Sequence, residues 1–498
     1  MNALRPLRVL LAVVLGLVAG GLGYGGWLVL RPPVDTVGRV GFEHPLRVPP
    51  LAESTVDGGG VRRFALDARP GVSDFGHGRT ATWGYNGAYL GPTLRLKQGE
   101  KVRVDVHNGL PEATTVHWHG MHLPAAADGG PAHPIRTGGT GTAAWTVNQP
   151  AATLWYHPHP DGRAEEQVYK GLAGMVIVDG SGPAADLPSR YGVDDLPVIV
   201  QDKGFEDDGN FRVPNPLGGT LGILGDTLLV NGTEGPFLDV TSSLVRLRLL
   251  NASTARSYLF AFSDGRSFDL VGTDGGLLAA PYRTDRIEVS TGERAEIVVA
   301  MKPGERVVLR SLPPDPDGGT VVRQFQGGGD RFDVLQLRAA AALSQSRPVP
   351  PHLADVARLD PAGAIPRTFE LANRAINGQK MAMDRVDVVA TRDVTERWTI
   401  HNDDFMQHNF HLHGTRFQVA ALNGRAPPPP LSGWKDTVNL RPGDRIELLV
   451  RFTDYADPTT AYMYHCHLFK HEDNGMMGQV VVIDPGQQVS LGHHHHHP

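Results

Sequence analysis

The feature that most constrains this chain is the placement of its histidines. Its 498 residues include 22 histidines, of which five form a run at 493–497 that we interpret as a purification tag or a metal-binding tail. Ten others fall in four clusters, at 117–119, 157–159, 408–413 and 465–471. A single His-x-His pair occurs by chance on solvated strands, but four such clusters do not, and they predict metal ligands. The remaining seven are interpreted as ordinary surface or core histidines: His44, His77, His107, His122, His133, His352 and His401.

The rest of the sequence is typical of an all-β protein. Its length suggests about three domains, and 60 glycines and 39 prolines favour short strands joined by turns over long helices. Alternating runs such as Lys101–Val106 and Leu244–Leu250 predict strands of β-sandwiches. Linkers at 180–197 and 344–366 separate the three expected sandwiches. These are expected at 45–181, 198–343 and 367–485, and a tail at 486–498 carries the histidine run.

Residues 1–35 are expected to direct the chain out of the cytoplasm. An uncharged apolar run at 9–30 would span roughly 33 Å as a helix, about the thickness of a bilayer core. Arg5 and Arg8 precede it, as the positive-inside rule expects for an exported body. We expect a membrane anchor, with a cleavable signal peptide as the alternative because small residues occupy 18–20. Either reading places the body in the periplasm or on the outer face of the cytoplasmic membrane.

The charge of the chain excludes one class of partner. The net charge is -6 and the 47 basic residues are spread along the sequence, which gives no electrostatic footprint for nucleic acid. We expect membrane contact only through the N-terminal segment, and a monomeric body.

The only cysteine, Cys466, cannot form an intramolecular disulfide, so it must serve packing or chemistry. Strand parity places it on the face opposite its two flanking histidines, where His408 and His471 can join it. Met476 offers a thioether, with Met477 as the adjacent alternative. Two imidazoles, one thiolate and a weak axial methionine form a blue-copper electron-transfer site.

Eight clustered histidines are left over, which is more than one metal can use. Three coppers with two or three histidines each would use all eight and leave open positions for dioxygen. Because Cys466 is covalently next to two of these histidines, an electron accepted at the blue copper has a short route to the cluster. The eight are His117, His119, His157, His159, His411, His413, His465 and His467.

With these ligands the sequence resembles the multicopper oxidase family, and within it the three-domain bacterial laccases and the cuprous oxidases of copper efflux. The resemblance covers roughly residues 45–485 and includes motifs at 82–87, 171–174, 198–203, 225–229, 433–438 and 471–473. It implies three cupredoxin-like Greek-key β-sandwiches after an N-terminal hydrophobic helix, and four copper ions. It implies a type 1 copper on His408, Cys466, His471 and Met476, a type 2 copper on His117 and His411, and a type 3 pair on His119, His157, His159, His413, His465 and His467.

Four more residues match functional positions of that family. Asp128 and Glu472 match acids that serve as proton relays. Asp404 and Met406 match positions that contribute to a substrate copper site. Their even offsets from His408 place them on the type 1 side if the segment is extended.

The chain departs from the efflux oxidases in one respect. Those relatives carry a methionine-rich insert near the type 1 copper, whereas this chain has 10 methionines in all and none in the linker at 344–366. We therefore expect an exposed type 1 edge that admits bulky organic donors.

The expected activity is the oxidation of a reducing substrate, one electron at a time, coupled to reduction of dioxygen to water. The donor is a phenol, as for a laccase, or a metal ion such as Cu(I), Mn(II) or Fe(II). The alternative is a non-enzymatic exported copper-binding or copper-storage protein. A structural cell-envelope protein of the same fold is disfavoured, because that role does not require Cys466 between two histidines.

Overall fold

The computed structural model describes residues 33–213, 222–314 and 327–490. The apolar run at 9–30 and the histidine run at 493–497 lie outside these ranges. Within them, no helix has the length and apolar character needed to cross a bilayer.

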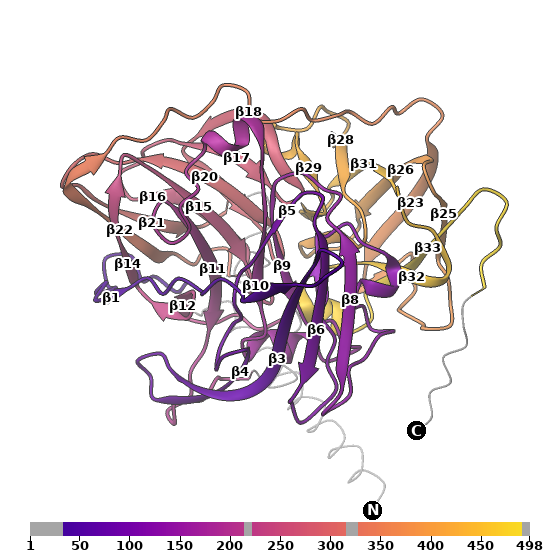
Figure 1. Ribbon diagram of the computed structural model, residues 1–498, viewed down its shortest axis with the longest axis horizontal. Helices are drawn as coiled ribbons and strands as arrows, with labels where there is room; N and C mark the ends of the chain where they lie inside the picture. The colour runs from indigo at the N-terminus through magenta and orange to yellow at the C-terminus, as the bar shows by residue number, and fades with distance from the viewer. Residues whose placement is uncertain (1–32, 214–221, 315–326, 491–498) are drawn as a thin grey trace, which may run out of the picture.

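Six sheets pack in pairs as three β-sandwiches, which confirms the predicted all-β fold (Figure 1). In Figure 1 the first sandwich lies in front, the second to its left and the third to its right. The few helical segments are short: η1 (Ala125–Ala127), α2 (Ala164–Tyr169), η2 (Gly182–Asp186), η3 (Pro429–Leu431) and α4 (Phe469–Asp473).

The first sandwich is built from strands between residues 54 and 179. One sheet has the order β2-β3-β6-β8, with β4 on β3: β2 (Ser54–Val56), β3 (Val61–Asp74), β6 (Lys101–Asn108), β8 (Thr140–Thr146) and β4 (Arg79–Tyr85). The other has the order β5-β10-β9-β7: β5 (Leu94–Lys97), β10 (Gly174–Asp179), β9 (Ala152–His157) and β7 (His117–His119). The alternating run predicted as a strand is β6, and its three valines are buried in the core between the sheets.

The second sandwich spans residues 195–344 and adds one strand from the start of the chain. Its six-stranded sheet consists of β1 (His44–Pro45), β14 (Pro236–Ser242), β22 (Phe332–Ser344), β21 (Arg306–Leu312), β16 (Tyr258–Phe262) and β19 (Arg286–Val289). Its seven-stranded sheet consists of β13 (Thr233–Glu234), β12 (Thr227–Val230), β11 (Asp195–Lys203), β15 (Leu244–Asn251), β20 (Arg294–Ala300), β17 (Phe268–Thr273) and β18 (Gly276–Thr284).

Strand β15 is the second alternating run predicted from the sequence, and its polar face is buried rather than solvated. Arg246 pairs with Glu296, and Arg248 binds Asp195 and Glu296. Arg248 also donates to the hydroxyl of Thr153 in the first sandwich, at 2.8 Å. The charged face of β15 is therefore an interface between sandwiches, where paired carboxylates compensate the buried guanidinium groups.

The third sandwich contains the strands between residues 365 and 483. One sheet consists of β24 (Ala375–Ile376), β23 (Ile365–Ala372), β26 (Thr395–Asn402), β31 (Arg445–Arg451), β28 (Phe417–Leu422) and β29 (Trp434–Lys435). The other consists of β25 (Val388–Thr391), β33 (Met477–Ile483), β32 (Asp457–His465), β27 (His408–Leu412) and β30 (Thr437–Leu440).

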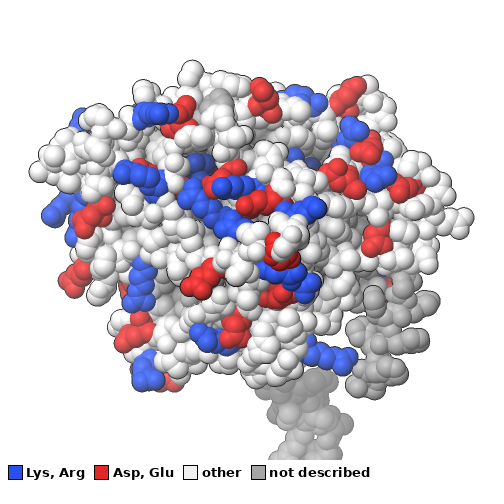
Figure 2. Space-filling view, viewed as in Figure 1, with Lys and Arg blue, Asp and Glu red and all other residues white. Residues whose placement is uncertain are grey.

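The first and third sandwiches are joined by specific polar contacts. The carboxylate of Asp473 in α4 accepts hydrogen bonds from the backbone amides of Ala164 and Glu165, at the start of α2. His122 lies between the carbonyl oxygen of Gly414 and the carboxylate of Asp454. On the face in Figure 2, acidic and basic side chains are interspersed. The contacts of Asp473 and His122 thus join the two sandwiches that carry the histidine clusters, which lie on or just after β7, β9, β27 and β32.

Candidate metal centres

Strand pairing brings the four histidine clusters together. His117 pairs with His157 across β7 and β9, and His411 pairs with His465 across β27 and β32. β7 is the edge strand of its sheet and faces the third sandwich, so the imidazoles of both pairs share one space. Trp118, between two of these histidines, points instead into the core of the first sandwich. All eight histidines of this cluster are at most 1% exposed.

The eight imidazoles sort into groups by distance. Three groups of three have ring nitrogens within 4.8 Å of one another: His119 with His157 and His467, His159 with His413 and His465, and His117 with His411 and His119, which belongs to two groups. In the last group the Nε2 atoms of His117 and His411 lie 3.3 Å apart. Each of these three groups takes histidines from both the first and the third sandwich.

Hydrogen bonds fix which nitrogen each ring presents to the cluster. Nδ1 of His117 donates to the backbone carbonyl of Asp128, and Nδ1 of His411 donates to that of Asp436. Both rings therefore turn a bare Nε2 toward each other. The same holds for His413 and His465, whose Nε2 atoms are 3.1 Å apart while each Nδ1 faces an oxygen.

This arrangement fits bound metal. Burial, followed by the neighbouring imidazoles, holds the pKa values of seven of the eight rings well below 6.5, so these rings are neutral. Neutral imidazoles whose lone pairs converge at about 3 Å repel one another unless a cation lies between them. Neutral imidazole is also the form that binds metal. The seven are His119, His157, His159, His411, His413, His465 and His467.

The second centre surrounds the cysteine, as parity predicts. The sulfur of Cys466 lies 3.5 Å from Nδ1 of His408 and 3.6 Å from Nδ1 of His471, and all three residues are fully buried. Burial raises the pKa of the thiol, but the two histidines outweigh it and lower that pKa to about 5. The thiolate is thus the stable form, as a soft metal ligand requires.

Backbone hydrogen bonds place Met476 beside this centre. Its amide donates to the carbonyl of His471, and its carbonyl accepts from the amide of Cys466, at 2.9 and 3.1 Å. Met477 instead begins β33 and pairs with His465 in the sheet. Both methionines are buried.

The two predicted acids lie against the histidine cluster. Asp128 Oδ2 accepts from Nδ1 of His413 at 2.7 Å. The Glu472 carboxyl lies 3.3 Å from Nδ1 of His465 and 3.5 Å from Nε2 of His159. Neither oxygen of Glu472 has a hydrogen-bond partner among the described residues. Burial raises the pKa of Glu472 well above 4.5, which favours the protonated carboxyl.

Asp404 lies beside the cysteine centre, but the alternation of side chains along a strand is not what places it there. The segment is not extended, as the parity argument required, because residues 404–406 form a bend between β26 and β27. The bend brings Asp404 Oδ2 to 3.3 Å from Nε2 of His408. Met406 is half-buried on the same bend, and its carbonyl accepts from the side chain of Asn402.

Three residues at these centres were not predicted. Asn409 Oδ1 accepts from the amide of His467 at 2.5 Å. Asp436 lies 3.0 Å from Nε2 of His119, and Arg294 binds Asp436. Asp436 belongs to the motif at 433–438, but the sequence assigns no role to any residue of that motif. Arg294 lies in a strand, and no sequence motif marks it as functional.

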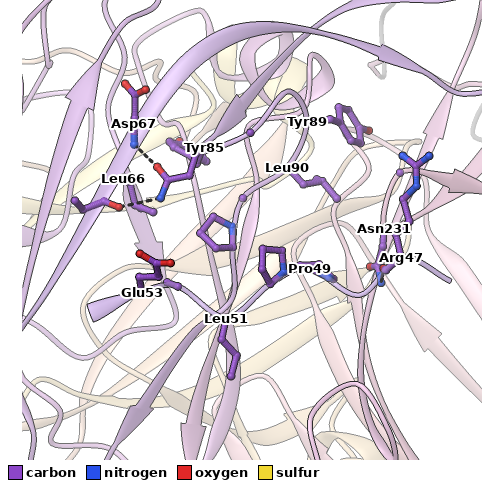
Figure 3. Close-up of a pocket in the computed structure, with 18 of the residues that line it drawn as sticks. Arg47, Pro49, Leu51, Glu53, Leu66, Asp67, Tyr85, Tyr89, Leu90 and Asn231 are labelled. Carbon is purple, nitrogen blue, oxygen red and sulfur yellow. Dashed lines mark hydrogen bonds between the residues drawn. The ribbon is translucent and has the colours of Figure 1, made fainter. Parts of the chain in front are cut away.

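A large cavity lies away from both centres, where residues 47–53 cross the first sandwich near Asn231 (Figure 3). Its volume is about 880 Å³. The Asn86 side chain on its wall accepts from the amide of Asp67 and donates to the carbonyl of Ala65. Among the described residues, none of the predicted ligands lines it.

Comparison with known proteins identifies the class. Multicopper oxidase family models match residues 70–182, 216–309 and 348–486. The chain is 37% identical to the multicopper oxidase mco of Staphylococcus haemolyticus, over 88% of this chain and 92% of the relative. It is 36% identical to the cell division protein FtsP of Yersinia pestis, over 93% and 97% of the two chains.

Solved structures agree. A multicopper oxidase from Pediococcus acidilactici has a TM-score of 0.80 and 33% identity, covering 91% of this chain and 94% of its own. The laccase-like multicopper oxidase CueO of a lignin-degrading Ochrobactrum has a TM-score of 0.80 and 35% identity, covering 88% and 100%. The fold and the buried donor sets define a cupredoxin-like copper protein. More particularly, the chain belongs to the multicopper oxidase family.

Proposed function

We propose that this protein is an exported oxidase that couples four one-electron oxidations of a phenolic or metal-ion donor to the reduction of dioxygen to water. The observation that carries the proposal is the position of Cys466 between His465 and His467. The rings of these two histidines belong to different groups of three. The cysteine centre is therefore covalently joined to both halves of the histidine cluster.

The donor sets suit four copper ions. Copper bound there would supply one-electron redox chemistry at the cysteine and open coordination positions for dioxygen at the histidines. A type 1 ion would be held by His408, Cys466, His471 and Met476, a type 2 ion by His117 and His411, and a type 3 pair by His119, His157, His159, His413, His465 and His467.

The acids of the chain have proton-handling roles in this proposal. Reduction of dioxygen to two waters consumes four protons as well as four electrons. The Glu472 carboxyl, 3.3 Å from His465 and with its pKa raised by burial, is the proposed proton donor. Asp128 accepts the Nδ1 proton of His413 and so keeps the Nε2 of that ring available as a ligand.

The bend at 404–406 is the proposed meeting point with the donor. The expected exposed type 1 edge is not observed, because His408 and His471 are fully buried and only 4% of the Asp404 side chain is exposed. A donor therefore meets the chain at the surface of the bend, and the Asp404 carboxylate, 3.3 Å from Nε2 of His408, is the proposed link to the cysteine centre. Phe405, next to it, is 68% exposed and offers an apolar surface to a planar organic donor. Asp404 and Met406 are the proposed contacts for a metal-ion donor. A phenolic donor is supported by the Ochrobactrum relative, described as acting on lignin model compounds and lignosulfonate.

Export and the oligomeric state are also part of the proposal. The apolar run at 9–30 with its preceding arginines supports delivery to the periplasm or the outer face of the cytoplasmic membrane, with or without retention as an anchor. The exported body is proposed to act as a monomer.

Relatives named cell division protein FtsP, with 35–36% identity, favour a rival role in the cell envelope. Copper storage without catalysis is a second rival. Against both stands the complete donor set, since neither role requires a buried thiolate covalently joined to two groups of histidines.

One experiment separates these roles. The chain is loaded with Cu(II), dialysed, analysed for metal and assayed for oxygen uptake with 2,6-dimethoxyphenol, Cu(I), Mn(II) and Fe(II), with zinc-loaded chain as the control. The proposal expects about four coppers per chain and donor-dependent oxygen uptake. Four coppers without uptake would favour storage, and about one copper or mainly zinc would contradict the ligand assignment.

A further inference from the structure

The middle sandwich supplies none of the metal-ligand candidates among the described residues, yet it sends a charged side chain to the histidine cluster. Arg294, the first residue of β20, is fully buried and binds the carboxylate of Asp436 in the third sandwich with two nitrogens. Nη1 donates to Oδ1 at 2.8 Å and Nη2 to Oδ2 at 2.5 Å. This two-pronged geometry fixes the plane of the carboxylate.

The guanidinium itself cannot turn. Its Nε donates to the carbonyl of Thr153 in the first sandwich, and its two Nη atoms also donate to the carbonyls of Gly292 and Asp274. Arg294 thus contacts all three sandwiches at once, through five hydrogen bonds that use its fixed fork of donors.

Asp436 passes this orientation to two histidines, one from each terminal sandwich. Its Oδ1 lies 3.0 Å from Nε2 of His119 and also accepts from the hydroxyl of Thr437. Its backbone carbonyl accepts from Nδ1 of His411 at 2.9 Å. The Thr437 hydroxyl lies 3.1 Å from the same Nε2 of His119 and 3.0 Å from the same Nδ1 of His411. Asp436, with this hydroxyl beside it, therefore sets which nitrogen each of these two rings turns toward the cluster.

The effect on His119 is distinctive. Because its Nε2 proton is held by Asp436, the ring presents Nδ1 to the cluster, 3.1 Å from Nε2 of His467 and 3.4 Å from Nε2 of His157. The other rings that face one another across the cluster present Nε2: His117, His159, His411, His413 and His465. With the opposite tautomer, His119 would turn an N–H toward the metal position.

The backbone at this junction is built around the pair. Gly120 has a φ of +81°, and a Cβ there would lie 2.5 Å from Asp436 Oδ2 and 2.6 Å from Nη2 of Arg294. Only glycine combines this backbone conformation with such a close approach. The first sandwich thus closes directly over the ion pair.

We propose that Arg294 and Asp436 are positioning residues through which the middle domain sets the tautomer of His119 and the assembly of the histidine cluster. The inference rests on the proposed copper function and assigns the middle domain a part in it. Neither residue touches the cysteine centre, so the effect is confined to the histidine cluster.

The test compares Arg294→Lys and Asp436→Asn with wild type and with the matched control Arg248→Lys. Arg248 is also a buried arginine of the middle sandwich with two carboxylate partners, but its hydrogen bonds and ion pairs within the described residues are to Asp195, Glu296 and Thr153, and none is to a histidine. In both Arg variants lysine keeps the charge and loses the fork. In Asp436→Asn, Asp274 remains 3.8 Å from Arg294 to compensate its charge.

Each copper-loaded chain is titrated with a chelator while the blue absorption, the total copper and the paramagnetic resonance signals are followed. We expect the chelator concentration that removes half of the non-blue copper to fall about 10–100-fold in Arg294→Lys and Asp436→Asn. The blue absorption of these variants and all copper of Arg248→Lys should remain as in wild type. Thermal unfolding of the metal-free chains provides the second readout: comparable unfolding temperatures in Arg294→Lys and Arg248→Lys, with copper loss only in the former, support positioning.

Unchanged retention in both variants, or equal loss of blue and non-blue copper, would overturn the inference, and so would the same loss in Arg248→Lys. A wild-type chain that binds no copper would instead overturn the proposed function, and this inference with it.

Discussion

The sulfur of Cys466 and Nδ1 of His408 lie 3.5 Å apart although 58 residues separate them in the chain. The contact joins the end of β32 to the start of β27, two neighbouring strands of one sheet. The thiolate is therefore held by the sheet itself, and replacing it should change the chemistry of the centre without disturbing the fold.

Cys466→Ser is expected to abolish the blue absorption and the donor-dependent oxygen uptake, because a hydroxyl is a poor ligand for copper. Most copper of the histidine cluster should stay bound, since none of its eight imidazoles is altered. Absorption spectroscopy with elemental analysis checks both points. A variant that remains blue would show that the sulfur is not a ligand.

Met476→Leu is expected to raise the reduction potential of the cysteine centre while the blue colour persists. Loss of a weak axial thioether removes electron donation to the oxidised state. Met477→Leu is the matched control, because that residue lies in β33 and pairs with His465 in the sheet. Redox titration followed at the blue band measures both variants. If they exchange behaviours, the axial position belongs to Met477.

Glu472→Gln is expected to slow oxygen reduction by ~10²-fold with the copper content unchanged, because the amide keeps the shape but cannot release a proton. Glu165→Gln is the control, since Glu165 is also a buried acid but binds the backbone amide of Ile223. Steady-state oxygen uptake at saturating donor is the measurement. Equal rates in wild type and Glu472→Gln would remove this carboxyl from the proton path.

Asp404 and Met406 at the bend are expected to determine how well the protein oxidises Cu(I). Wild type should oxidise phenols without added copper. Asp404→Ala and Met406→Ala should lose most Cu(I) oxidation, since they remove a carboxylate and a soft thioether. Asp403→Ala, which removes an exposed neighbouring acid, serves as the control. A wild type inert toward phenols until excess Cu(II) is added would contradict the proposal of a phenolic donor.

Burial of Glu165 makes the metal-free chain less stable at high pH. Burial raises the pKa of this residue to about 7 from 4.5, so the folded chain keeps a proton that the unfolded chain has lost. Stability therefore falls as the pH rises from about 4.5 through 7, by at most ~3 kcal/mol from this group. Urea unfolding at pH 5 and pH 8 should show a smaller difference for Glu165→Gln than for wild type. The exposed-site variant Glu53→Gln should match wild type.

Sequence patterns predicted which side chains come together, because strand geometry is local. Successive side chains of a strand point to opposite faces, which separates Cys466 from His465 and His467. The same alternation separates His408 from His411, and the observed groups of side chains follow this division. Parity failed at Asp404, where the chain bends and an alternating count no longer applies.

The alternation of side chains along a strand does not predict interactions between sandwiches. Arg248 occupies an alternating strand whose polar face looks solvated in sequence and is buried in the fold. Arg294 and Asp436 lie 142 residues apart, and nothing local marks either as the partner of the other. Such pairs follow from how whole domains dock, which one sequence does not encode in any short pattern.

The sharing of ligands between the first and third sandwiches has a consequence for biosynthesis. His117 and His411 are 294 residues apart, so the contact between them closes a very long loop and forms late. A nascent chain that ends before β27 carries only one or two members of each imidazole group. Metal capture by the full cluster is thereby coupled to completion of the polypeptide, and a truncated or half-docked chain has no assembled centre at which oxygen chemistry can begin.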